Sequence, residues 1–168
     1  MLRYPPKRLA QVILAFIIAG VEISANSSFV SFQIQSEEHP FYTTYKGVQI
    51  GMSIEEARKK LGEPADKNTG QDFYEFSPDE MAQVSYDASG VVTAIAVTYF
   101  KASDAPTAKN VLGVDIEPQL NGNLYKLIRY PKAGYWVSYS RTEGDPTVIT
   151  VSMTKIEPNK PNETNNAS

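Results

Sequence analysis

The sequence repeats itself, and this repetition limits the possible folds more than any other feature of the chain. Three pairs of short segments match in the same order, at offsets of 51, 53 and 56 residues: "ARKKLG" (57–62) with "AKNVLG" (108–113), "VSY" (84–86) with "VSY" (137–139), and "VVTAIAVT" (91–98) with "TVITVSMT" (147–154). Internal duplication of a unit of about 50 residues explains these matches, because the offsets grow only where turns are expected. Chance similarity among short β-rich segments is the alternative explanation.

The stretch "GMSIEEARKKLGEP", residues 51–64, predicts a short helix with both ends marked. Ser53 is a favourable N-cap, and Glu56, three residues later, completes a capping box. Gly62 can adopt the left-handed conformation that ends a helix, and the proline two residues later prevents continuation. We therefore expect a helix at 54–61, which is too short to be stable unless it packs on other elements.

The repeat predicts a second helix at "AKNVLG", with Asp104 as the N-cap that corresponds to Ser53. Three segments after the first helix have strand composition, namely 73–76, 81–87 and 91–100, and "DASG" forms the turn between the last two. Each repeat unit is therefore a helix followed by an antiparallel meander.

Alternation in the last strand of each unit predicts two different faces of the sheet. One face should carry the larger apolar side chains, which are Val91, Ile95, Val97, Ile149, Val151 and Met153. The other face should carry small or polar side chains, which are Ala94, Ala96, Thr98, Thr150, Ser152 and Thr154. Helices on the apolar face and solvent on the other would give this pattern.

We therefore expect an α+β fold in which two tandem helix-plus-meander modules, 46–101 and 102–156, form one sheet with the short helices on one face. Neither module buries enough apolar surface alone, so the two should fold as one cooperative domain. Residues 26–45 form an N-terminal extension in this division of the chain.

The first unit resembles the module shared by the outer-membrane assembly lipoproteins of the SmpA/OmlA (BamE) group. In tandem it is similar to the β-lactamase inhibitory protein architecture, in which two such modules form one sheet. The resemblance covers roughly residues 46–156 and rests on the following positions: Gly51, Met52, Leu61, Gly62 and Pro64 in the first unit, and Leu112 and Gly113 in the second. It implies a protein-binding role, like that of an assembly factor or an inhibitor.

The N-terminus has the layout of a secretory signal peptide. Arg3, Lys7 and Arg8 precede the apolar stretch 9–21, and small residues follow it at 24–28. We expect residues 1–25 to be removed on export, so that the product is periplasmic or secreted. An uncleaved inner-membrane anchor at 9–21 is the alternative, although a membrane span usually needs about 20 apolar residues.

Composition excludes several classes of function. The net charge of −3 and the lack of clustered Lys and Arg argue against nucleic-acid binding. The chain has no cysteine, which excludes disulfides, thiolate metal sites and a lipidated N-terminal cysteine. Residues 157–168 have too few apolar side chains to offset the entropy of ordering, so we expect a disordered tail there.

No pattern of residues predicts catalysis, a metal site or a cofactor. His39 is the only histidine and precedes the modules, so it lacks the further ligands that zinc requires and the scaffold that a catalytic base requires. The adjacent carboxylates are expected to be helix caps or solvated charges, and they are Glu37–Glu38, Glu55–Glu56 and Asp79–Glu80. We therefore predict that the protein is not an enzyme.

Binding has better candidates, and they lie in "YPKAGYWVSYS". If Val137 points inward, Trp136 and Ser138 point outward on the face without helices, and an exposed Trp often anchors a protein interface. A turn at 132–134 would place Tyr130 and Tyr135 close to Trp136. The alternative is that Trp136 is covered by the N-terminal segment "SFVSFQIQ", residues 28–35, whose alternation suggests an added strand.

These observations favour an exported, non-enzymatic module that binds a protein partner in the cell envelope and contacts a membrane only through an uncleaved N-terminal anchor. A small cell-envelope hydrolase is the alternative, and it would require clustered carboxylates with raised pKa values in a cleft. A purely structural role, which spaces the tail from a membrane anchor, is the third possibility.

Overall fold

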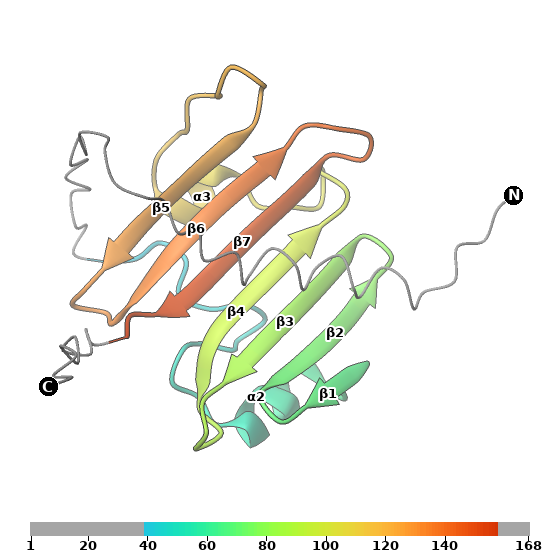
Figure 1. Ribbon diagram of the computed structural model, residues 1–168, viewed down its shortest axis with the longest axis vertical. Helices are drawn as coiled ribbons and strands as arrows, with labels where there is room; N and C mark the ends of the chain where they lie inside the picture. The colour runs from blue at the N-terminus through green and yellow to red at the C-terminus, as the bar shows by residue number, and fades with distance from the viewer. Residues whose placement is uncertain (1–38, 158–168) are drawn as a thin grey trace, which may run out of the picture. The chain divides into compact units, whose positions relative to one another are not determined.

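The computed structural model describes residues 39–157. The described chain forms one seven-stranded antiparallel sheet in the order β1-β2-β3-β4-β7-β6-β5 and two short helices (Figure 1). The strands are β1 Asp66–Asn68, β2 Gln71–Ser77, β3 Glu80–Tyr86, β4 Val92–Tyr99, β5 Leu124–Tyr130, β6 Tyr135–Thr142 and β7 Val148–Lys155. The predicted signal peptide, residues 26–38 of the predicted extension and residues 158–168 of the predicted tail lie outside the described residues.

The first helix, α2, spans Ile54–Leu61, as the sequence predicts. The Glu56 amide donates to Ser53 Oγ at 3.2 Å, and the Ser53 amide donates to Glu56 Oε2 at 3.1 Å, so both halves of the capping box are present. Gly62 ends the helix with φ of +86° and donates from its amide to the Arg58 carbonyl. Ala57 and Leu61 are the buried side chains that hold α2 against the sheet.

The second helix, α3, spans only Ala108–Leu112, and its N-cap is Thr107. The Asn110 amide donates to Thr107 Oγ1 at 3.2 Å. The prediction that Asp104 caps this helix is therefore wrong. A helix that started at Asp104 would need Ala105 in the α conformation immediately before Pro106, and the proline ring disfavours that conformation.

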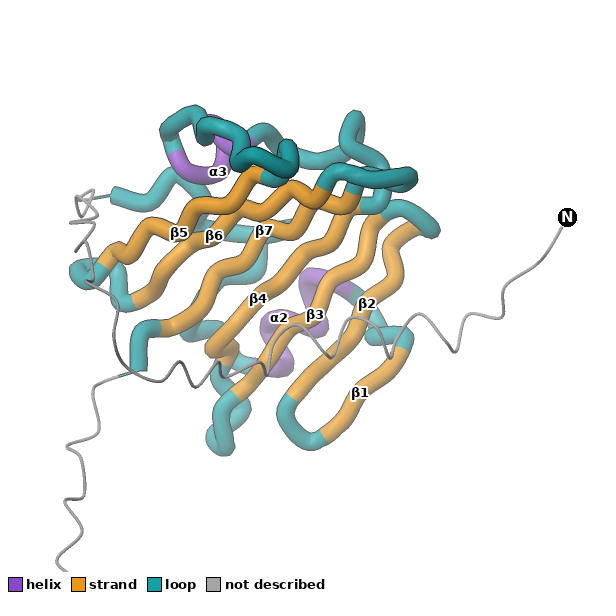
Figure 2. The backbone as a smooth tube through the Cα atoms, turned by 45° about the horizontal axis from the view of Figure 1, so that its top comes forward, coloured by secondary structure: helices purple, strands orange, loops and turns teal. Residues whose placement is uncertain are grey.

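Both helices lie on the same face of the sheet, α2 behind the half that contains β2 and β3 and α3 behind the half that contains β5 and β6 (Figure 1). The strands are continuous across the sheet from β1 to β5 (Figure 2). The centre of the sheet is the antiparallel pairing of β4 with β7. The fold class is therefore α+β, with a single sheet, as expected.

The predicted alternation holds in β7 and in most of β4. Ile149, Val151 and Met153 are buried, and the residues between them are partly exposed. In β4 the alternation is broken near its start, where the register to β3 shifts between Ser85 and Tyr86. Because of this shift Val92 takes the buried position that the sequence assigned to Val91.

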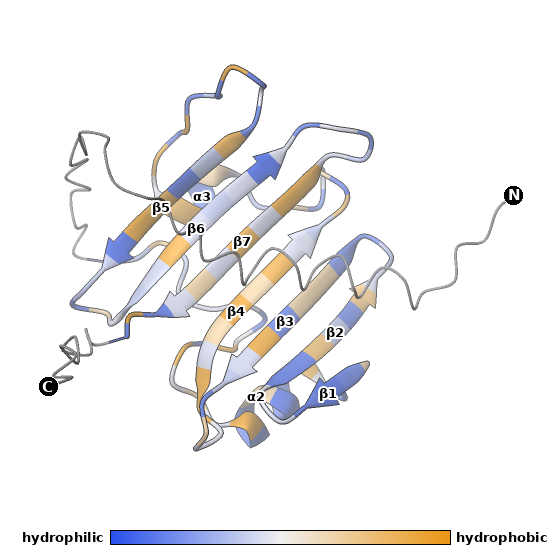
Figure 3. Cartoon of the chain, in the orientation of Figure 1, coloured by the Kyte–Doolittle hydropathy of each residue, from blue (hydrophilic) through white to orange (hydrophobic). Residues whose placement is uncertain are grey.

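The sequence does not predict β1, whose three residues, Asp66–Asn68, are all exposed and hydrophilic (Figure 3). β1 forms because "NTG" turns the chain back onto β2, with the Gly70 amide donating to Asn68 Oδ1 at 3.1 Å. A turn and main-chain pairing stabilise this strand, and its sequence therefore shows no apolar alternation.

The core lies between the sheet and the two helices, and tyrosine contributes an unusual share of it. The buried tyrosines are Tyr45, Tyr74, Tyr86, Tyr99, Tyr130, Tyr135 and Tyr139. Valines from the central strands and Ala57, Val111 and Leu112 from the helices complete the same cluster. Within residues 39–157, neither helix is long and apolar enough to cross a membrane.

Candidate functional site

The face of the sheet opposite α2 and α3 is the candidate interaction surface, and we call it the open face. Its centre is formed by alternate residues of β4, β6 and β7, namely Ala94, Ala96, Thr98, Trp136, Ser138, Ser140, Thr150, Ser152 and Thr154. Their neighbours along each strand, such as Val97, Val137 and Val151, are buried in the core with helix residues. No helix among the described residues covers the open face (Figure 1).

The open face is lined by short side chains that lie directly opposite one another. Ser138 pairs with Ser152, which in turn pairs with Ala96. Trp136 pairs with Thr154 on β7 and with Arg129 on β5. Trp136 is the largest side chain of this set, is partly exposed, and has residues with hydroxyl and methyl groups as neighbours. A sheet face on which short side chains surround a large aromatic residue offers a partner both close approach and an anchor.

The structure separates the four residues that the sequence singled out for binding. Trp136 and Ser138 lie on the open face, as predicted. The turn at 131–134 also forms, but Tyr130 and Tyr135, which it pairs, are 1% and 8% exposed in the core. Tyr135 precedes Trp136 by one residue and therefore points to the opposite face of the strand.

Tyr130 and Tyr135 pack against each other, with ring centroids 6.2 Å apart. The Tyr135 hydroxyl also lies 3.5 Å from the Tyr42 carbonyl, which it contacts as a donor. These contacts support the hairpin from inside. The alternative prediction, that residues 28–35 cover Trp136, concerns a segment outside the described residues.

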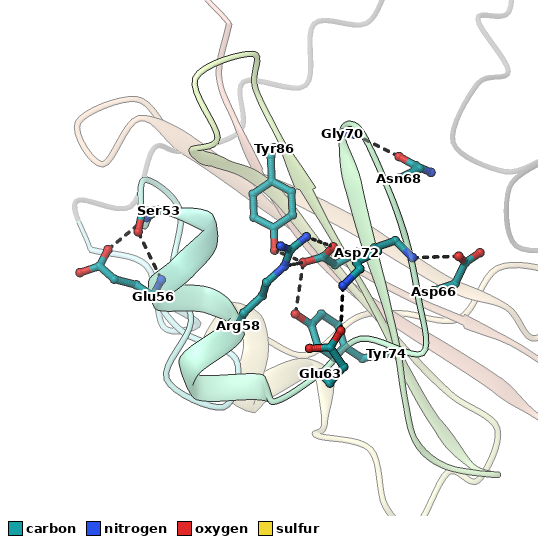
Figure 4. Close-up of polar contacts among 11 residues, drawn as sticks. Ser53, Glu56, Arg58, Glu63, Asp66, Asn68, Gly70, Asp72, Tyr74 and Tyr86 are labelled. Carbon is teal, nitrogen blue, oxygen red and sulfur yellow. Dashed lines mark hydrogen bonds and ion pairs between the residues drawn. The ribbon is translucent and has the colours of Figure 1, made fainter.

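A buried polar cluster joins α2 to the sheet on the other face (Figure 4). Asp72 on β2 is 0% exposed, and Arg58 on α2 donates to it through Nε to Oδ2 and through the guanidinium NH2 to Oδ1, each at 2.8 Å. The Tyr86 hydroxyl donates to Oδ2 at 2.9 Å, and the Tyr74 hydroxyl lies 3.4 Å from the same oxygen. The carboxylate is therefore paired and surrounded by donors, as a buried charge requires.

The pKa shifts in this cluster follow from burial and from the shared carboxylate. Burial alone raises the pKa of Asp72, but hydrogen bonds from Arg58 and Tyr86 outweigh it, and the pKa lies below its ordinary value. Hydrogen bonding to Asp72 raises the pKa of Arg58. Burial, and then the adjacent carboxylate, raises the pKa of Tyr74 to about 12. The cluster thus stays ionised at Asp72 and Arg58 and protonated at Tyr74, which suits an ion pair rather than a proton-transfer site.

The sequence patterns described above do not predict this cluster, although the sequence contains a signal for it. Asp72 stands next to the predicted strand 73–76, on the same parity as the buried Tyr74, so an acidic residue at an inward position needed a partner. Arg58, in the last turn of α2, is also the kind of cation that commonly lies near the C-terminal end of a helix. Sequence spacing did not show that α2 places Arg58 directly over Asp72.

A second polar group connects the segment before α2 to the start of β3. The Tyr45 hydroxyl donates to Glu80 Oε1 at 2.8 Å, and Lys46 Nζ lies 3.3 Å from the same oxygen. Lys46 Nζ also lies 4.6 Å from the centre of the Phe76 ring, a cation–π distance. Glu80 therefore has a structural partner in the described chain.

The other carboxylates singled out in the sequence also have defined positions. Glu56 completes the cap of α2, and Glu55 is exposed beside it. His39 is exposed at the start of the described chain. Within residues 39–157, no group of three His, Asp or Glu side chains is arranged to hold a metal ion. The absence of catalysis, metal and cofactor remains a prediction from the sequence.

Comparisons with known proteins identify no relative of this chain. No protein-family model matches the chain, and no curated protein and no solved structure matches it. The fold and the open face must therefore be interpreted from the chain itself.

Proposed function

We propose that this protein is an exported, non-enzymatic module that binds a protein partner in the cell envelope through the open face of its sheet. The observation that carries the proposal is the position of Trp136 among short side chains on a sheet face that bears no helix within residues 39–157. The signal-peptide layout of residues 1–25 supports export.

The proposal includes an origin by duplication, in which residues 46–101 and 102–156 are tandem modules. The register of β4 with β7 supports it, because Ala96 pairs with Ser152. These two residues are also counterparts at the offset of 56 residues that aligns the last strands. A local twofold axis through this pair would relate the two halves, and Ala94↔Thr154 and Thr98↔Thr150 are then equivalent pairs.

The match between the two "VSY" segments fits less closely. Val137 pairs with Met153 on β7, whereas Val84 pairs with Ile95 on β4, two residues away from Val97, the counterpart of Met153. A shift of two residues leaves every side chain on its original face. Divergence of a duplicated unit by a two-residue slip therefore preserves both the core and the open face.

The resemblance to the SmpA/OmlA (BamE) module and to the β-lactamase inhibitory protein architecture is part of the proposal. The capped helix α2, followed by an antiparallel meander and joined through β4 and β7 to a second helix-and-meander unit, supports it. Fold similarity alone does not determine function, so the partner must be sought through the open face.

Site-directed photocrosslinking from the open face tests the proposal. A photoreactive side chain at Ser152, which lies between Ser138 and Ala96, should capture the partner in cells that export the protein. The same probe at Lys59, exposed on α2, is the matched control and should capture nothing of that mass. Trp136→Ala should abolish capture from Ser152 while the protein stays folded, because truncation of an interface anchor commonly costs about 2 kcal/mol or more.

The outcome is decisive in either direction. Equal capture from Ser152 with and without the Trp136→Ala substitution would show that Trp136 is not an anchor. Capture from Lys59 instead of Ser152 would move the interface to the helix face and would contradict the proposal.

A further inference from the structure

The two edges of the sheet are formed by β1 and β5, and β5 is the longer strand. The short strand β1 pairs with the outer edge of β2 at Gln71–Phe73. Among residues 39–157, no strand pairs with the outer edge of β5, which ends the sheet (Figure 2). A seven-residue strand at an open edge presents unpaired amide and carbonyl groups that can pair with a further strand.

The side chains of β5 show which strand could pair there. Tyr125, Leu127 and Arg129 lie on the same side as the open face, because their partners across β6 are Ser140, Ser138 and Trp136. Tyr125 is 56% exposed. No proline occurs within β5, and its register to β6 has no bulge, so the usual devices that block an edge geometrically are missing from this strand.

We propose that β5 pairs with β5 of a second copy of this chain, antiparallel and around a twofold axis at Leu127. This register pairs all seven residues of the strand. Leu124 then lies opposite Tyr130 of the second copy, and each residue between them also has a partner. The twofold axis stands perpendicular to the sheet, so the open faces of the two copies lie on the same side.

Charge disfavours two of the alternative registers. Lys126 and Arg129 are the cations of β5, and the proposed register places Ile128 and Tyr125 of the second copy opposite them. Shifting the axis to Lys126 or to Arg129 would place two cations directly opposite each other, which destabilises a strand pair. The proposed register instead places Leu127 against itself and Arg129 against an aromatic ring, where a cation–π contact is favourable.

The dimer would extend the surface proposed for partner binding, but it does not depend on that function. Tyr125 of the second copy would continue the row formed by Arg129, Trp136 and Thr154. Self-association and partner binding can therefore be tested separately.

The chain has no cysteine, so single cysteines report the register without background. Leu127→Cys in the full-length chain should give a disulfide-linked species of twice the mass under mild oxidation, because residues opposite each other lie about 4.5–5.5 Å apart. Tyr125→Cys alone should not, since its two copies would be about 13 Å apart along the strands. Tyr125→Cys combined with Arg129→Cys should crosslink again.

A second experiment measures self-association of the chain in the absence of crosslinking. Sedimentation of the cysteine-free chain should show a concentration-dependent species of twice the mass. Leu127→Lys should raise its dissociation constant about tenfold or more, because it places two cations on the axis. Ala133→Lys, which adds the same charge at the exposed β5–β6 turn, is the matched control and should leave association unchanged.

Crosslinking of Leu127→Cys no more efficient than that of Tyr125→Cys would overturn the proposal. A monomer at every concentration would do the same. A disulfide from Leu127→Cys to a different protein, instead of to a second copy of this chain, would likewise contradict the proposal.

Discussion

Arg58 and Asp72 form a two-pronged ion pair across the boundary between α2 and β2, with both N···O distances at 2.8 Å. Asp72 is fully buried, whereas Arg58 keeps about a third of its side chain exposed (34%). The pair therefore fixes a helix of only eight residues over the sheet, and Tyr86 adds a third hydrogen bond to the same carboxylate.

Replacement of Asp72 by asparagine should destabilise the protein by about 2–3 kcal/mol at neutral pH. The amide cannot accept both guanidinium bonds as a carboxylate does, and it leaves Arg58 without its counter-charge. The cost falls below that of a fully buried pair because water still reaches Arg58. Urea unfolding monitored by circular dichroism measures it, and Glu75→Gln, an exposed residue on the same strand, is the control.

The same pair predicts how stability responds to acid. The folded-state pKa of Asp72 lies below its ordinary value of about 3.9, so its contribution is present above that pH and is lost as the pH falls through the folded pKa. The difference in unfolding free energy between the natural chain and Asp72→Asn should therefore shrink between about pH 5 and pH 2. A difference that stayed constant across this range would show that the carboxylate charge is not responsible.

Buried tyrosines predict a second loss of stability, at alkaline pH. Burial raises the pKa of Tyr74 and of Tyr99 to about 12, and burial together with a hydrogen bond to a carboxylate also raises the pKa of Tyr45 and of Tyr86. Because the unfolded chain loses these protons near pH 10, stability should be complete below that pH and should fall as the pH rises toward 12.

Tyrosinate absorbance and far-ultraviolet circular dichroism should therefore change together in an alkaline titration, because the buried hydroxyls ionise only as the fold opens. Full tyrosinate absorbance with native circular dichroism would refute the prediction.

The sequence predicted the features that depend on local chemistry. Ser53, Glu56 and Gly62 mark the ends of α2, and alternation in β6 places Trp136 on the open face, because caps and strand parity involve only near neighbours. The features that it missed depend on contacts distant in sequence. The register shift that buries Val92 is set by how β3 meets β4, and the partner of Asp72 is set by how α2 meets β2.

The second helix, α3, does not begin where the alignment of the two units predicts. The offset of 51 residues aligns Ala57 with Ala108 and Leu61 with Leu112, which are all buried, but it places the cap at Asp104 although Thr107 is the cap. Thr107→Ala should therefore cost about 1 kcal/mol and lower the melting temperature by about 4 °C, because the Asn110 amide loses its acceptor. Asp104→Ala, whose carboxylate accepts only from Ser103 in the described contacts, should change stability by less than about 0.5 kcal/mol. Thermal unfolding of the two variants side by side measures the difference, and the reverse order of their melting temperatures would assign the cap to Asp104 after all.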